Sequence, residues 1–241
     1  MTVDTNSDLR ERIAERLFLV RDQISEAAKA AGRDTNDITL IGVSKYFPPE
    51  YARTAVELGL IDLGENRVQE LLEKSDYLAS YNLHPRWHLI GTLQSRKVRS
   101  VVGRSELIHS VDSTKRIEEI DEASSSIRFC SDILLQVNVS GEESKHGFSP
   151  DDVSRAVEAA AGLENIRLRG IMTMAPIRTE ETDPYDVFRK TKDLFDRITT
   201  AYPSCADFNI LSMGMSQDYI DAIQCGATHI RIGTAIFGHR D

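Results

Sequence analysis

The sequence predicts an α/β fold of the (β/α)8 TIM-barrel class, preceded by an extra N-terminal helix. Eight short apolar runs alternate with stretches of helical periodicity, and the connections are long enough for the crossover helices that parallel strands require. Eight parallel strands also close a barrel with a packed interior. No low-complexity segment or Pro/Gly/Ser-rich linker divides the chain, so we expect residues 1–241 to form a single domain.

The extra helix comes first and has the clearest periodicity in the sequence. Its apolar residues recur three or four positions apart and form one stripe, namely Leu9, Ile13, Leu17, Val20, Ile24, Ala27 and Ala31. We expect Ser7 to cap the start of this helix and Gly32 to end it in a left-handed turn.

Strands and helices then alternate along the rest of the chain. We expect strands at residues 38–44, 61–63, 87–90, 107–111, 133–139, 168–172, 208–211 and 229–232. The helices between them are expected at residues 49–58, 94–102, 114–124, 151–162, 185–202 and 218–225. One more helix is expected to pass through Gln69 and Leu72. Gly59 ends the first of these helices, and the longest loops are expected at residues 140–149 and 175–184.

The composition is that of an ordinary globular protein, with 41% hydrophobic and 28% charged residues. The net charge of −9 argues against a broad nucleic-acid-binding surface. No apolar run approaches the roughly 20 residues that span a bilayer, and the polar N-terminus is unlike a signal peptide. Cys130, Cys205 and Cys225 form no CxxC motif, so we expect a cytoplasmic protein with reduced, buried, structural thiols.

The most informative stretch is the C-terminal third, where two apolar runs each end in small and hydroxyl-bearing residues. Residues 211–216 read LSMGMS and residues 230–234 read IRIGT. Small residues let backbone N–H groups approach an anion, and a helix N-terminus just beyond adds its positive dipole end. The two segments therefore predict a divided phosphate cup, formed by Ser212, Gly214, Ser216, Gly233 and Thr234. The alternative interpretation is a pair of ordinary strand-to-helix turns.

Lys45 stands at the inner end of the first expected strand, where an unpaired ammonium is costly. Partial desolvation lowers the pKa of a lysine and favours the neutral amine, which attacks aldehydes to form a Schiff base. The alternative is a rim lysine that reaches water or pairs with Glu65.

Lys45 and the cup together predict a ligand with an aldehyde and a phosphate, and pyridoxal 5′-phosphate (PLP) has both. PLP sites supply an acidic or arginine partner for the pyridine nitrogen, and Arg231 lies two residues before Gly233. An arginine cannot accept a proton, so the ring nitrogen would stay unprotonated and the ring would be a weak electron sink. The alternative for Arg231 is a salt bridge inside the barrel.

Five ordered motifs carry a resemblance that covers nearly the whole chain. They are IGVSK at 41–45, GENRVQE at 64–70, WHLIGTLQSRK at 87–97, LSMGMS at 211–216 and IRIGTAIFG at 230–238. The chain resembles the pyridoxal phosphate homeostasis protein family, whose members are single-domain barrels related to the N-terminal domain of alanine racemase.

The resemblance implies that Lys45 binds PLP, that Arg231 faces the pyridine nitrogen, and that Ser216, Gly233 and Thr234 hold the phosphate. Asn66, His88 and Ser212 fall where the family lines its pocket. Two departures are visible, because Thr92 stands where the family usually has proline and Arg96 where it has asparagine. Lys145 falls in a segment that resembles the family's loop after the fifth strand, where it would be a second amine or a solvated lysine.

Two further groups of residues give weaker signals. His84, His88 and His109 have no metal-ligand spacing with acids or cysteines, so we assign no metal. Arg96, Lys97, Arg99 and Arg104 form a basic cluster that we interpret as a solvated helix face, with a docking surface for an acidic partner as the alternative.

The family resemblance implies a non-catalytic PLP carrier that acts in PLP homeostasis and could pass PLP to apo-enzymes. A PLP-dependent racemase and a PLP lyase or aldolase on the same barrel are the alternatives. Racemization needs an acid–base group on each face of the substrate, and Lys45 serves only one. We expect no room after the eighth strand for the second domain of alanine racemase, although Lys145 or Arg178 could hold a substrate carboxylate. The carrier is therefore favoured, as a monomer without membrane or nucleic-acid partners.

Overall fold

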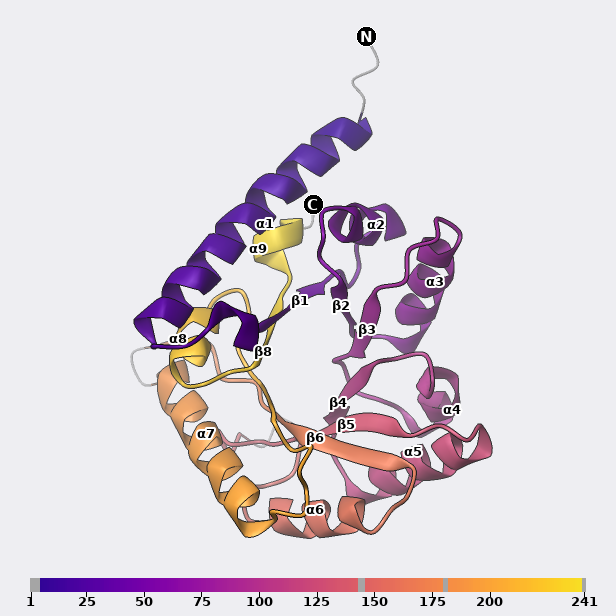
Figure 1. Ribbon diagram of the computed structural model, residues 1–241, viewed down its shortest axis with the longest axis vertical. Helices are drawn as coiled ribbons and strands as arrows, with labels where there is room; N and C mark the ends of the chain where they lie inside the picture. The colour runs from indigo at the N-terminus through magenta and orange to yellow at the C-terminus, as the bar shows by residue number, and fades with distance from the viewer. Residues whose placement is uncertain (1–4, 143–145, 180–181, 240–241) are drawn as a thin grey trace.

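The computed structural model describes residues 5–142, 146–179 and 182–239. Eight parallel strands form a closed barrel in chain order, and β8 pairs with β1 to complete it (Figure 1). The strands are β1 (Thr39–Val43), β2 (Asp62–Glu65), β3 (Arg86–Leu89), β4 (Leu107–Val111), β5 (Ser131–Gln136), β6 (Ile166–Met172), β7 (Ile210–Ser212) and β8 (His229–Ile232). The predicted (β/α)8 barrel is thus confirmed.

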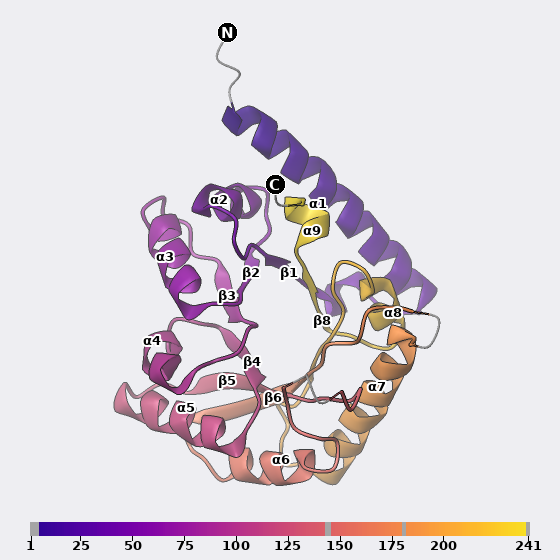
Figure 2. The ribbon, with the colours of Figure 1, turned by 180° about the vertical axis from the view of Figure 1, so that it is seen from behind.

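Helices surround this barrel on its outside (Figures 1 and 2). They are α1 (Thr5–Ala30), α2 (Pro49–Glu57), α3 (Val68–Ala79), α4 (Val98–Val101), α5 (Thr114–Ser126), α6 (Val153–Ala161), α7 (Pro184–Ala201), α8 (Tyr219–Gln224) and α9 (Thr234–Phe237). Two 3-10 helices, η1 (Thr35–Asp37) and η2 (Ser95–Lys97), precede β1 and α4. The extra helix α1 packs across α8, α9 and α2, where the first and last parts of the chain meet.

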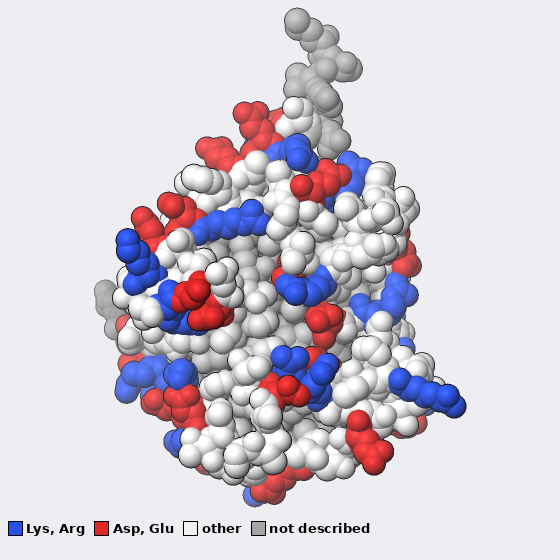
Figure 3. All heavy atoms as spheres, viewed as in Figure 1, with Lys and Arg blue, Asp and Glu red and all other residues white. Residues whose placement is uncertain are grey.

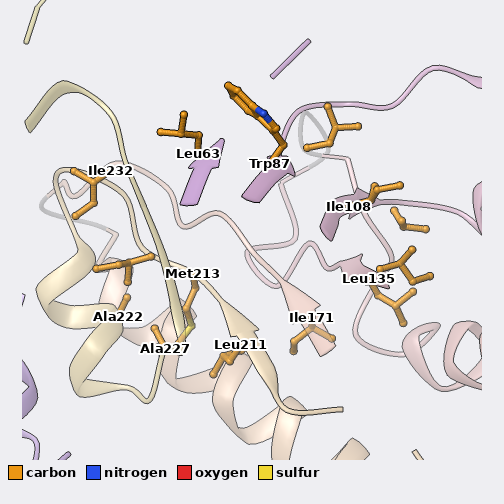
Figure 4. Packing of buried hydrophobic residues seen from close by; sticks show 14 of the residues in the cluster. Leu63, Trp87, Ile108, Leu135, Ile171, Leu211, Met213, Ala222, Ala227 and Ile232 are labelled. Carbon is orange, nitrogen blue, oxygen red and sulfur yellow. The ribbon is translucent and has the colours of Figure 1, made fainter. Parts of the chain in front are cut away.

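The main core lies between the strands and the helices. Side chains alternate along each strand, so every second residue points outward. Figure 4 shows these outward side chains, among them Leu63 of β2, Ile108 of β4 and Ile171 of β6, all less than 2% exposed. Burying a side chain of this size contributes about 1.5–3 kcal/mol. The apolar stripe of α1 joins the same core, with Ile13 and Leu17 nearly inaccessible.

The inward-facing side chains form a second, smaller set. Leu107, Leu134, Met172 and Ile210 make an apolar cluster of their own, which is separate from the outer core. Other inward positions are polar, and they include His88, His109, Ser212 and Arg231. The barrel interior is therefore partly a hydrogen-bonded network, and this network matters for the functional site.

Most element positions agree with the sequence prediction, and the differences lie at element ends. Helix α1 already includes Thr5, so Ser7 lies inside the helix and the prediction that it is the cap was wrong. Gly32 does end the helix region, with a φ of 66°, and Arg33 N donates to Ala28 O at 2.9 Å.

Several expected elements are also displaced. Strand β2 continues to Glu65, β5 ends at Gln136 and β7 begins at Ile210. The ends of each strand are set by the residues with which it pairs on the adjacent strands. The expected helix at 94–102 is instead split into η2 and the four-residue α4.

The expectation that all three cysteines are buried was wrong. Cys225 is buried, Cys205 is half-buried and Cys130 is exposed. Cys130 lies in the short connection between α5 and β5. Within the described residues, no helix is long and apolar enough to cross a membrane. The same residues contain no cluster of histidine, cysteine and acidic side chains that could hold a metal ion.

Candidate functional site

A cavity of about 700 Å³ opens at the carboxyl ends of the strands, the face seen in Figure 2. Function in barrels of this kind collects at these strand ends. The cavity brings together six of the nine predicted site residues, namely Lys45, Asn66, Ser216, Arg231, Gly233 and Thr234. Arg231 lies in β8, and the other five follow β1, β2, β7 or β8, so the closure of the barrel is what places them side by side.

Lys45 follows β1 and Ser44 and is half-buried. It also borders a smaller cavity of about 310 Å³ that Phe47 and Gly238 help to line. Gly233 and Thr234 border both cavities as well. The lysine therefore stands at the junction of the two cavities, next to the predicted phosphate cup.

Side chains of α3 hold the backbone on both sides of Lys45. Lys74 Nζ donates to the Ser44 carbonyl at 2.7 Å, and Tyr46 N donates to Glu70 Oε2 at 2.8 Å. Tyr46 has a φ of 66°, a left-handed conformation that non-glycine residues rarely adopt. Both peptide groups that flank Lys45 are thus fixed by α3, which limits the positions its side chain can reach.

Glu65 anchors this arrangement from β2. Its Oε1 atom accepts hydrogen bonds from Lys74 Nζ and Ser44 Oγ, each at 2.6 Å. Among the described residues, Oε2 has no hydrogen-bond partner, and the side chain is fully buried. Burial raises the pKa of the Glu65 carboxyl, while Lys74 and Ser44 oppose the shift. The sequence offered Glu65 as a partner for Lys45, but this carboxylate binds the ammonium of Lys74.

The two halves of the predicted phosphate cup meet at Ser216. Its hydroxyl oxygen lies 3.2 Å from Gly233 N and 3.5 Å from Ala235 N, at the start of α9. A Cβ atom at Gly233 would come 3.2 Å from the carbonyl oxygen of Val43. Small size at this position therefore lets β8 approach β1 and leaves hydroxyl and N–H groups at the cavity wall, which is donor chemistry that suits a phosphate.

Arg231 reaches the cavity from β8 and is 4% exposed. Its guanidinium donates to Ser212 Oγ at 2.6 Å and to the Thr173 carbonyl at 2.9 Å. Burial lowers the pKa of Arg231 to about 10, and the nearby Asp218 partly opposes the shift. No carboxylate among the described residues lies within 4.0 Å of the guanidinium, so the alternative of an interior salt bridge was wrong.

Three predicted residues do not line this cavity. Ser212 is fully buried behind Arg231. Gly214 lies in the turn after β7 with a φ of 95°, and its carbonyl accepts from Arg231 N at 3.0 Å. A Cβ atom there would come 2.6 Å from the Ala222 Cβ atom. Both residues therefore support the site from behind.

His88 lies at the other end of the barrel. It lines a cavity of about 500 Å³ at the amino ends of the strands, together with Asp62 and His229. Arg33, Arg86, Arg169, Asp37, Glu106 and Asp132 also line this floor cavity, and Figure 3 shows charges of both signs around the hollow at the middle of this face. The structure thus does not bring His88 to the wall of the Lys45 cavity.

Sequence reasoning missed the apolar wall and two titratable residues. Asp218 lines the cavity from the segment between β7 and α8, and burial raises the pKa of its carboxyl. Met174, Ala175, Pro176 and Ile177 line the cavity from the loop after β6, and His146 lines it from the loop after β5. The length of these two loops in the sequence was the available signal.

The remaining predictions concern exposed residues near the cavity. Thr92 lines the cavity and Arg96 does not. Of the two departures from the family pattern, only Thr92 therefore changes the cavity wall. Arg178 lines the rim but forms ion pairs with Asp183 at 2.8 Å and Asp221 at 2.6 Å, which compete with a substrate carboxylate. Lys145 lies outside the described residues.

The basic cluster agrees with a solvated surface. Arg99 pairs with Glu122 and Arg104 pairs with Asp76, and all four of these paired side chains are exposed. Such exposed pairs contribute little to stability.

Comparisons with known proteins agree with this geometry. Residues 22–241 match the family model described as the alanine racemase N-terminal domain. A pyridoxal phosphate homeostasis protein of Aquifex aeolicus is 40% identical over 94% of this chain and 97% of that protein. One of Pseudomonas aeruginosa is 41% identical over 95% and 96%. The structure of PipY from Synechococcus elongatus with PLP bound is 32% identical, covers 94% of this chain and all of that chain, and has a TM-score of 0.82.

Proposed function

Because this chain belongs to the pyridoxal phosphate homeostasis protein family, on the barrel of the alanine racemase N-terminal domain, we propose that it binds PLP and acts in PLP homeostasis. In this role it carries or buffers the cofactor. Relatives with that name match this chain over nearly their full length, and the structure of one relative contains bound PLP.

One observation carries the proposal to particular residues. A single cavity of about 700 Å³ is bordered by an amine, by hydroxyl and N–H donors, and by a buried guanidinium. These groups come from Lys45, from Ser216 with Gly233 and Thr234, and from Arg231. An aldehyde, a phosphate and a pyridine nitrogen are the matching groups on PLP, so the residues present fit the cofactor.

In this assignment Lys45 would hold PLP, whose aldehyde would supply the electrophilic carbon for a lysine Schiff base, with release of water. Hydrogen bonds from side chains of α3 to both peptide groups beside Lys45 hold its amine at the junction of the two cavities. Ser216 and the N–H groups near Gly233 would hold the phosphate, and Asn66, which follows β2, would border the ligand. Arg231 would donate to the ring nitrogen, which would then carry no proton.

We further propose that this is a carrier without robust catalysis. An arginine opposite the ring nitrogen gives poor support for carbanion chemistry, and the rim arginine Arg178 is already paired with two aspartates. His146 and Asp218 both line the wall and are able to accept a proton, so a racemase mechanism on this barrel would need one of them as its second base. The proposal extends to apo-enzymes that accept PLP, to a monomeric state and to a cytoplasmic location.

The first experiment is absorbance spectroscopy of the purified protein with PLP, before and after borohydride. We expect a visible-edge band that reduction removes, together with a reduced PLP adduct on the peptide that contains Lys45. Lys45→Ala should lose both signals and keep its circular dichroism spectrum. A Lys45→Ala protein that keeps the reducible band at full stoichiometry would move the attachment to another lysine, with Lys145 as the next candidate.

The second experiment separates carrier from racemase. L-Alanine and L-serine are incubated with the PLP-loaded protein in deuterated water, and chirality and deuterium content are measured by chromatography and mass spectrometry. We expect only trace exchange for the native protein and for His146→Gln. Turnover above roughly 1 s⁻¹, the low end of ordinary enzyme rates, that disappears in His146→Gln or in Asp218→Asn would establish the racemase instead.

A further inference from the structure

A chain of buried polar side chains crosses the barrel interior from the floor cavity to Arg231. Each link is a short contact between neighbouring groups, in the order Arg231 to Ser212 at 2.6 Å, Ser212 to His109 at 2.9 Å, His109 to His88 at 3.0 Å, and His88 to Asp62 at 3.0 Å. Ser212 and His109 are fully buried, and His88 is 2% exposed. The PLP cavity and the floor cavity, at opposite ends of the barrel, are thus linked by side-chain hydrogen bonds.

The chemistry of its two ends fits one direction of hydrogen-bond donation along this chain. At the floor, the Asp62 carboxylate accepts, so His88 donates from Nε2. A His88 ring that carries a single proton then accepts at Nδ1. His109 must then donate from Nε2 to His88 and accept at its own Nδ1. Ser212 therefore donates its single proton to His109. This leaves a lone pair of Ser212 Oγ for Arg231, which can only donate.

The electrostatics are consistent with that direction. Burial lowers the pKa of His109 well below its ordinary value, and the charge of Arg231 lowers it further, so the ring stays neutral at pH 7. Burial alone would raise the pKa of Asp62, but hydrogen bonds from His88 and Arg86 outweigh it and keep the carboxyl ionised. Arg86 holds Asp62 through two hydrogen bonds of 2.8 and 2.6 Å.

We propose that Asp62, on the floor of the barrel, is a positioning residue for Arg231, acting through His88, His109 and Ser212. The inference rests on the proposed function in one respect, that Arg231 faces the ring nitrogen of PLP. A serine hydroxyl that is free to rotate can aim its proton at the guanidinium, which repels it. When the hydroxyl proton of Ser212 is donated to His109, a lone pair of Ser212 Oγ always faces the Arg231 guanidinium. The guanidinium then keeps one orientation toward the cavity.

The direction of the chain can be tested without cofactor. Protein labelled with ¹⁵N in its histidines is studied by long-range ¹H–¹⁵N correlation near pH 7.5, with His88→Gln and His109→Gln spectra used for assignment. We expect both His88 and His109 as neutral rings protonated at Nε2. A ring protonated at Nδ1 at either position would overturn the proposal, because the chain would then not run from Arg231 to Asp62.

The effect on Arg231 is tested with three folded variants and PLP. His88→Leu breaks the chain, His88→Gln keeps one acceptor and one donor at that position, and His229→Leu is the matched control. The ring of His229 lies 6.3 Å from that of His88 and 6.4 Å from that of His109, but its Nδ1 atom faces Thr228 and it is outside the chain. We expect His88→Leu to raise the Kd for PLP about fivefold, the size of one net hydrogen bond.

The readout specific to positioning is the ¹⁵N shift of ring-labelled PLP bound to each variant. It should move in His88→Leu and match the wild type in His88→Gln and His229→Leu. Ser212→Ala gives the same break if His88→Leu does not fold. The proposal would be overturned if folded His88→Leu or Ser212→Ala protein gave the wild-type ¹⁵N shift of bound PLP and the wild-type Kd for PLP. If the wild-type protein itself bound no PLP, the proposed function would fail, whereas the histidine tautomers would still report on the chain.

Discussion

Replacing Lys74 by methionine tests how the backbone beside Lys45 is held. The substitution keeps the length of the side chain but removes the ammonium that binds the Ser44 carbonyl and Glu65. Lys74 and Glu65 are 4% and 0% exposed, so the variant leaves a buried carboxylate without its counter-charge. Removing one partner of such a pair costs about 3–5 kcal/mol.

The loss is measured by urea and thermal unfolding. For a domain of this size, about 1 kcal/mol corresponds to roughly 2–4 °C, so Lys74→Met should unfold roughly 6–20 °C below the wild type. The double variant Glu65→Gln/Lys74→Met should recover part of this loss, because a neutral amide is less costly to bury than a charge. Arg99→Met, which removes an exposed pair, is the control and should change stability by less than about 1 kcal/mol.

The pH dependence follows from the raised pKa of Glu65. A carboxyl whose pKa is raised in the folded state stabilises the protein below its ordinary pKa of 4.5, and this contribution is lost as pH rises through the folded value. Without Lys74 the pKa should rise further, so the penalty of Lys74→Met should be smaller at pH 5 than at pH 8. The reasoning is refuted if Lys74→Met costs less than about 1 kcal/mol at pH 8, or if the double variant is no more stable than the single one.

Three further outcomes are expected. Ser216→Ala and Thr234→Ala should each weaken PLP binding by about 1.5–3 kcal/mol, the range for a hydrogen bond to a charged group, and the double variant more so. Fluorescence titration measures this, and unchanged affinity in the double variant would place the phosphate elsewhere. In Lys74→Met, the rate at which borohydride traps PLP on Lys45 should fall, whereas Arg99→Met should match the wild type. Burial lowers the pKa of His229 to about 3, so its stabilising contribution is present above pH 6.5 and is lost as pH falls toward 3. His229→Gln should therefore flatten the stability curve from urea unfolding between pH 6.5 and 5, and a slope equal to the wild type would contradict a neutral, buried His229.

The sequence by itself determined the barrel and the centre of the candidate site. Apolar periodicity is a local property, so the eight strands and the stripe of α1 could be recognised residue by residue. Parallel strands of a barrel end on one face, so Lys45 and the segments around Ser216 and Gly233 could be expected to meet there. Motif chemistry then pointed to a ligand with an aldehyde and a phosphate.

Only the tertiary structure decided how deep each inward residue lies and what it contacts. His88 lies opposite Gly64 on β2 and Leu107 on β4, and this register places its ring at the floor of the barrel instead of beside Lys45. Lys74 is one of several polar residues on α3, and only the packing of α3 against β2 carries its ammonium to Glu65. Strand register and helix packing depend on contacts between distant parts of the chain, which local periodicity does not encode.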